Sequence, residues 1–136
     1  MAAVVSGGRL VRRDRVGVDR LALADLVPEL AVDPIILGEI RFGILLLPRG
    51  RCRTRLERWF EDGVQKFLCI PWEASTGLRW AELLATLRSK GRAMPIKDSL
   101  IAATPLAHDL AVVTLSRRDF DAAGVVVVDP AAGPRR

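Results

Sequence analysis

The stretch IKDSLIAATPLAHDLAVVT (residues 96–114) decides the fold class, because a helical pattern passes directly into a short apolar strand. Pro95, just before it, suits the first position of a helix over 95–108, where its fixed φ fits and no N–H donor is needed. The last four residues of the stretch, Ala-Val-Val-Thr, are typical of a buried strand. The stretch therefore predicts a helix followed directly by a buried strand of a sheet.

The same alternation extends in both directions. Upstream, the patterns predict helices over 35–47, 51–66 and 73–90, with a short buried strand at 67–70 and Gly91 as a helix C-cap. Downstream, residues 115–123 read as a turn with a short polar segment, and Val125 to Val128 as a second apolar strand. Short apolar strands that alternate with helices indicate an α/β fold with a mainly parallel sheet. In such sheets, sites form at the carboxyl ends of the strands.

The first 33 residues differ from the rest. A strand-like start at Leu10-Val11 runs at once into Arg12 and Arg13, and arginines in succession do not fit a buried parallel strand. Residues 20–31 can form a helix. We therefore divide the chain into an atypical segment at 1–33 with a degenerate first strand and helix, a domain at 34–130, and a flexible tail at 131–136.

Composition excludes several classes of protein. With 136 residues, half of them hydrophobic, the chain fits one globular domain. No apolar run approaches the roughly 20 residues of a membrane span, and no apolar segment follows the first arginines as in a signal peptide. Cys52 and Cys69 lack metal-type spacing, which favours free thiols in a reducing cytoplasm. His108 is the only histidine, so zinc and histidine-based catalysis are poorly supported. Trp59, Trp72 and Trp80 are expected in the core.

The net charge of +5 is unevenly distributed. Five arginines fall within residues 49–58, where Glu57 is the only acid. A basic strip of this kind favours phosphate backbones. The alternative is an ordinary solvated helix face in an arginine-rich protein.

Two carboxylates stand in apolar surroundings, Glu39 within residues 35–43 and Asp98 within 96–104. Desolvating an unpaired charge is costly, and a hard cation shared by both would offset that cost. The alternatives are local. Asp98 suits the first turn of a helix because of the helix dipole, and Glu39 can pair with Arg41 or a remote arginine.

A longer pattern contains both acids. Its parts are Leu37-Gly38-Glu39-Ile40-Arg41-Phe42-Gly43-Ile44, Leu47-Pro48-Arg49-Gly50-Arg51, Gly91-Arg92, Ile96-Lys97-Asp98-Ser99-Leu100-Ile101-Ala102-Ala103-Thr104, His108, Val112-Val113-Thr114, Arg118-Asp119-Phe120, Gly124 and Asp129-Pro130. In this order and spacing the chain resembles PIN-domain ribonucleases of the VapC and FitB toxin type, over about three quarters of its length.

The resemblance implies a three-layer α/β/α sandwich and Mg²⁺- or Mn²⁺-dependent cleavage of RNA by the toxin of a toxin–antitoxin pair. It also implies a cognate antitoxin as partner and a homodimer. In this reading Glu39 and Asp98 are metal ligands. The remaining site positions are a fourth position at Ser116, an outer acid at Asp119, and two arginines that contact phosphate, Arg41 and Arg118.

The chain departs from the family pattern in two places. The family's first acid lies in an Asp-Thr-Asn turn after the first strand, and no such turn occurs here; its place would be close to Met1. Pro105 stands where a helix former is usual. Three functions therefore stay open. They are an active endoribonuclease, an impaired PIN-like protein that only binds antitoxin or RNA, and the product of a damaged reading frame.

Overall fold

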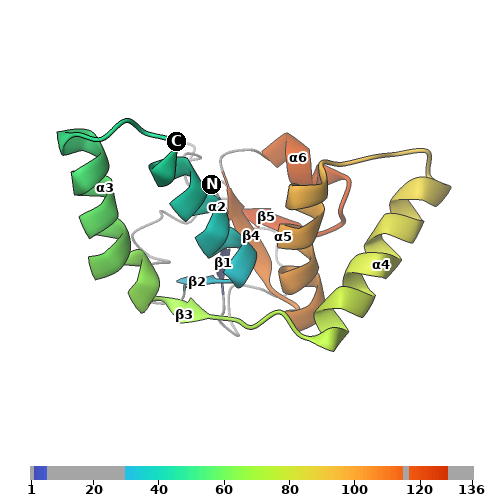
Figure 1. The fold of residues 1–136 in the computed structure, drawn as a ribbon. Helices are drawn as coiled ribbons and strands as arrows, with labels where there is room; N and C mark the ends of the chain where they lie inside the picture. Colours follow the sequence, from blue (N-terminus) through green and yellow to red (C-terminus); the bar gives the residue numbers. More distant parts are fainter. Residues whose placement is uncertain (1, 6–29, 115–116, 129–136) are drawn as a thin grey trace, which may run out of the picture.

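The computed structural model describes residues 2–5, 30–114 and 117–128, which form a five-stranded sheet with helices packed against it (Figure 1). The elements are β1 (Ala2–Val5), β2 (Leu30–Val32), α2 (Pro34–Leu45), α3 (Arg51–Asp62), a 3-10 turn (Val64–Lys66), β3 (Leu68–Cys69), α4 (Ala74–Ser89), α5 (Ile96–His108), β4 (Ala111–Thr114), α6 (Arg117–Asp121) and β5 (Val126–Val128). In the part of the chain that is described, no helix has both the length and the apolar character that crossing a membrane requires.

The strand order is β3-β2-β1-β4-β5. β2 pairs parallel with β3 and β4 parallel with β5, whereas β1 runs antiparallel to both of its neighbours, β2 and β4. Four strands therefore share one direction, as a mainly parallel sheet requires, and the central strand is reversed. The α/β class predicted from residues 96–114 is confirmed. The reversal was not predicted, because residues 1–18 carry no clear strand pattern.

The core lies between the sheet and the helices that flank its centre. Ile36 of α2, Ile101 of α5, Val112 of β4 and Phe120 of α6 are all buried in one cluster, together with Leu83 and Leu87 of α4. Figure 1 shows α3 and α4 at opposite ends of the molecule, with α2 and α5 between them. The two predicted acids therefore lie on the two central helices.

Local signals explain where these helices begin and end. Asp33 is the N-cap of α2 and Pro34 its first residue, the arrangement that both residue types favour. After α4 the chain turns at Gly91 with φ of 64°, as a glycine near a C-cap allows, so that prediction is confirmed. α5 begins at Ile96, directly after Pro95, and ends at His108, so Pro105 does not interrupt it.

Four details of the sequence prediction are wrong. Both residues of β3 are exposed, because this two-residue strand lies at the edge of the sheet rather than inside it. The polar segment at 115–123 contains a helix, α6. Leu30 and Ala31, assigned to a helix, belong to β2. Trp59 is 44% exposed and lies outside the core, and Trp72 and Trp80, also expected there, are only half-buried. The rest of the predicted helix at 20–31, the strand start at Leu10-Val11 and the tail at 131–136 lie outside the described residues.

Candidate active site

Asp98 lies in the first turn of α5 and is half-buried. Burial raises the pKa of its carboxyl above the ordinary value, and the charges of Asp119 and Glu39 raise it further, against a lowering effect of Lys97. Asp98 on α5 is therefore affected electrostatically by acids of two other helices, Asp119 of α6 and Glu39 of α2.

Glu39 extends from α2 toward the start of α5. Its side chain is 22% exposed, and its Oε1 lies 3.3 Å from the Nζ of Lys97, the residue before Asp98. The sequence alternatives for Glu39 were Arg41 or a remote arginine. The structure selects a lysine instead, and this lysine comes from the helix that carries the second acid.

The other predicted site residues divide into two groups. Asp119 and Arg118 lie on α6 and are exposed, and Figure 1 shows α6 beside the N-terminal end of α5. Arg41 pairs with an acid outside the proposed site: its Nη1 lies 3.7 Å from Oε1 of Glu57 on α3. Two residues apart on a helix, Glu39 and Arg41 project to different sides. Ser116 lies outside the described residues.

A further acid, Asp33, was missed by sequence reasoning. It is fully buried, and its Oδ1 accepts a hydrogen bond of 2.8 Å from the N–H of Ile36. Its Oδ2 accepts a hydrogen bond of 2.7 Å from the hydroxyl of Thr104 on α5. Burial raises the pKa of Asp33 despite these hydrogen bonds. The signal that could have found it is Asp-Pro at the start of an apolar helix. Asp33 thus ties α2 to α5.

The donor set suits a hard divalent cation, which prefers carboxylate oxygens and keeps several waters. Two carboxylates that are partly desolvated and repel one another become favourable when such a cation neutralises them. Among the described residues, however, no three acidic, histidine or cysteine side chains lie close enough together to hold a metal ion. β1, whose sequence is Ala-Ala-Val-Val, supplies no further acid. Glu39 and Asp98 therefore fit a largely hydrated ion.

The surface next to Glu39 is hollowed between α2 and α3. This hollow has a volume of about 250 Å³ and is lined by Glu39, Ile40, Gly43, Ile44, Leu56 and Trp59. It is mainly apolar, and Trp59 covers one side of it. We call it the α2–α3 hollow. It offers a place for an apolar group beside the acids.

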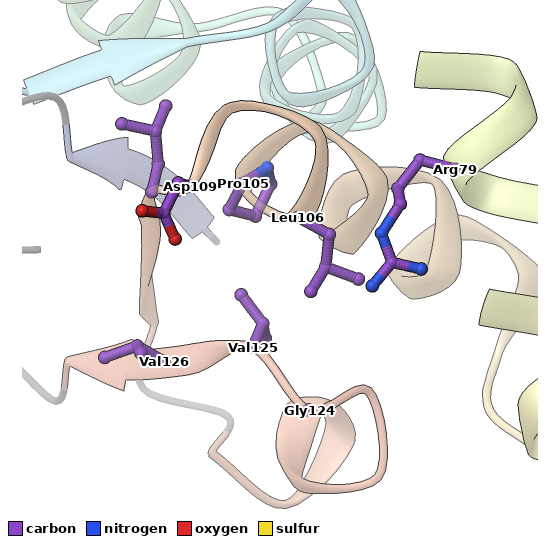
Figure 2. Close-up of a pocket in the computed structure, with 8 residues that line it drawn as sticks. Arg79, Pro105, Leu106, Asp109, Gly124, Val125 and Val126 are labelled. Carbon is purple, nitrogen blue, oxygen red and sulfur yellow. The ribbon is translucent and has the colours of Figure 1, made fainter. Parts of the chain in front are cut away.

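A second cavity, of about 180 Å³, lies at the other end of α5 (Figure 2). Asp109 and Arg79 line it from α5's C-terminal end and from α4, and Val125 and Val126 from the start of β5. It is at the edge where the parallel strands begin. Ligand sites of α/β sheets form at the opposite edge, so we do not assign this cavity to the site.

The chain is similar in sequence to known proteins over most of its length. The chain is 30% identical to VapC ribonuclease Y4jK of Sinorhizobium fredii over 110 residues, which is 79% of each chain. It is 31% identical over 110 residues to the plasmid stability protein StbB of Pseudomonas syringae pv. tomato, again covering 79% of each. The chain belongs to the VapC/FitB family of PIN-domain toxins. A scan against protein-family models gave no match.

Solved structures of this family have the same fold. The crystal structure of FitAcB from Neisseria gonorrhoeae matches 79% of this chain and 81% of its own, with 26% identity and a TM-score of 0.72. That of VapBC-5 from Mycobacterium tuberculosis matches 72% and 79%, with 28% identity and a TM-score of 0.63. The PIN-like α/β fold implied by the sequence is therefore confirmed for this VapC/FitB-type chain.

The raised pKa of Asp98 leads to a pH prediction for the metal-free protein. Because burial and the neighbouring acids raise this pKa in the folded state, the folded protein holds a proton that the unfolded chain releases near pH 3.8. Stability therefore falls as pH rises from about 3.8 through the raised value. Melting temperatures in EDTA between pH 4 and 7 should decline more for the wild type than for Asp98→Asn. Parallel curves would contradict the assigned environment of Asp98.

Proposed function

We propose that this protein is a divalent-metal-dependent endoribonuclease, the toxin of a toxin–antitoxin pair that acts in the cytoplasm. The observation that carries the proposal is geometric: Asp98 lies in the first turn of α5, and Glu39 of α2 pairs at 3.3 Å with Lys97, the residue directly before Asp98. This arrangement occurs in a chain of the VapC/FitB family, whose member Y4jK is named a ribonuclease. The acids match the charge that a nuclease metal requires.

Glu39 and Asp98 would hold the ion, directly or through water, and Asp119 would accept hydrogen bonds from its hydration shell. When bound, Mg²⁺ or Mn²⁺ supplies a water of lowered pKa and stabilises negative charge on phosphate oxygens. The protein itself contributes the placement of these carboxylates. Burial of Asp98 limits competition from bulk water, and the Asp33–Thr104 hydrogen bond fixes the two ligand-bearing helices relative to each other.

RNA is the proposed substrate, and the basic surface of α3 supports this. Arg51, Arg55 and Arg58 are exposed along one face of the helix and form what we call the arginine stripe. None of the three pairs with a carboxylate among the residues that the structure describes. Unpaired arginines in a row attract a phosphate backbone and fix its register, without reading sequence. On α6, exposed Arg118 would add a phosphate contact nearer the acids.

An antitoxin is the proposed protein partner. The α2–α3 hollow is apolar, has Glu39 at its border and is large enough for one or two side chains. An apolar antitoxin segment laid there would cover the acids, a common mode of peptide recognition. A homodimer is also proposed, by analogy with the family, and the exposed Leu78 of α4 and Ile96 of α5 are apolar candidates for that contact.

Metal removal tests the enzymatic proposal. Purified protein incubated with a structured RNA is expected to cleave it in Mn²⁺ and to lose cleavage in excess EDTA, with activity restored when Mn²⁺ is returned. Product ends are mapped on a sequencing gel. The control is RNA with Mn²⁺ alone. Cleavage that persists in EDTA would refute the metal-dependent mechanism.

A second function is favoured by one observation: among the described residues, no group of three acidic, histidine or cysteine side chains could hold a metal ion together. An impaired PIN-like protein would bind RNA or antitoxin without cleaving. The same experiment separates the two. Retention of RNA in a gel-shift assay, with no cleavage at any Mn²⁺ concentration, would support the binding protein.

A further inference from the structure

The ion pair between Lys97 and Glu39 joins the two helices that carry the proposed metal ligands. The Nζ of Lys97 on α5 lies 3.3 Å from Oε1 of Glu39 on α2. Lys97 directly precedes Asp98, so its ammonium group is also the nearest cation to the second ligand in sequence. One positive charge therefore already partly neutralises the acids when no metal is bound.

A divalent cation held by the Glu39 carboxylate would repel this ammonium, because the two positive charges would lie close to each other. Metal binding therefore weakens the ion pair between Lys97 and Glu39. The Lys97 side chain is 59% exposed and its stem is flexible, so it can leave without any change in the backbone. The Glu39 side chain is only 22% exposed, so it is more confined than that of Lys97.

We propose that Lys97 is the resident counter-ion of Glu39, which a divalent cation displaces when it binds. Lys97 is then a positioning residue that keeps Glu39 directed toward Asp98 in the metal-free protein and sets the affinity for metal. This inference rests on the proposed metal dependence. It goes beyond that proposal because it assigns a role to a residue that is not itself a ligand.

The test is metal affinity rather than activity. Mn²⁺ binding to the full chain is measured by isothermal titration calorimetry for the wild type, Lys97→Met and Lys97→Arg. Methionine keeps most of the stem and removes the charge, so Lys97→Met should bind Mn²⁺ roughly 3–10-fold more tightly, as expected from one nearby repulsive charge at a partly exposed site. Lys97→Arg should return to within about 2-fold of the wild type. The matched control, Lys90→Met, changes an exposed lysine at the end of α4 and should leave the affinity unchanged.

A second readout follows the displaced lysine directly. Acetylation of Lys97 by a limiting reagent, quantified by mass spectrometry against Lys90, should increase when Mn²⁺ is added to the wild type. A lysine with only a structural role would not change its reactivity with metal. Far-UV circular dichroism of each variant confirms that it is folded.

The outcomes separate this inference from the proposed function. If the wild type binds Mn²⁺ but Lys97→Met binds no more tightly, the counter-ion role is wrong and the metal-dependent function stands. If the wild type and Lys97→Met both fail to bind Mn²⁺, the proposed metal dependence fails and the inference fails with it. Tighter binding in Lys97→Met together with metal-dependent acetylation establishes the displacement.

Discussion

Replacing Asp98 with asparagine is expected to reduce kcat/KM for RNA cleavage by roughly 100-fold or more. Changes in groups that only support a metal ligand already cost about 10–100-fold, and the loss of a ligand should reach at least the upper end. Asparagine keeps the size of the side chain but removes the charge that would hold the cation. Initial rates with one defined RNA at saturating Mn²⁺ measure the effect.

The matched control is Asp62→Asn, a change of the same chemistry at an exposed acid at the end of α3. It should cleave at the wild-type rate. The variant Asp98→Asn should also remain folded, because removing a charge whose folded-state pKa is raised relieves repulsion in the metal-free protein. Wild-type cleavage by Asp98→Asn would remove this residue from the mechanism, and equal loss in Asp62→Asn would point to a nonspecific charge effect.

Replacing Asp33 with alanine is expected to lower the free energy of unfolding by about 2–3 kcal/mol. The change removes a helix N-cap, typically worth about 1 kcal/mol, and leaves the buried hydroxyl of Thr104 without its acceptor, which costs about 1–3 kcal/mol. Relief of the buried charge offsets part of the loss, since burial raises the pKa of Asp33. Urea denaturation at pH 7 in EDTA measures the difference.

Asp33→Asn is the informative companion variant. Its amide oxygen still accepts from the N–H of Ile36, and its amide nitrogen can donate to the oxygen of Thr104. It should therefore lose less than half as much stability as Asp33→Ala. A loss below about 0.5 kcal/mol for Asp33→Ala would show that the link between α2 and α5 contributes little.

The fold was predictable where apolar residues recur with the period of a helix or a strand and where proline or glycine marks the ends. Helices α2 to α5 and strands β4 and β5 follow from apolar periodicity, from Pro95 and from Gly91. The errors arise where the burial of a segment depends on which other elements pack against it. Leu68 is apolar but exposed, because it lies at the edge of the sheet. Trp59 is also exposed, and which face of α3 is covered depends on how α3 packs on α2.

The acids of the candidate site could be proposed from the sequence, but their counter-charges could not. Glu39 and Asp98 stand out as carboxylates in apolar runs, and their role as metal ligands stays a prediction. The pairing of Glu39 with Lys97 depends on how α2 and α5 cross, which no spacing within one helix reveals. Arg41 of α2 was proposed as a phosphate contact near Glu39, and its side chain pairs with Glu57 of α3, a partner that its position in the sequence does not reveal.

The buried hydrogen bond from Thr104 to Asp33 spans 71 positions along the chain. During synthesis residue 33 leaves the ribosome long before residue 104. The hydrogen bond between α2 and α5 therefore forms only after most of the polypeptide has emerged. Glu39 and Asp98 lie 59 positions apart, so the proposed active site likewise forms only after most of the chain has been made.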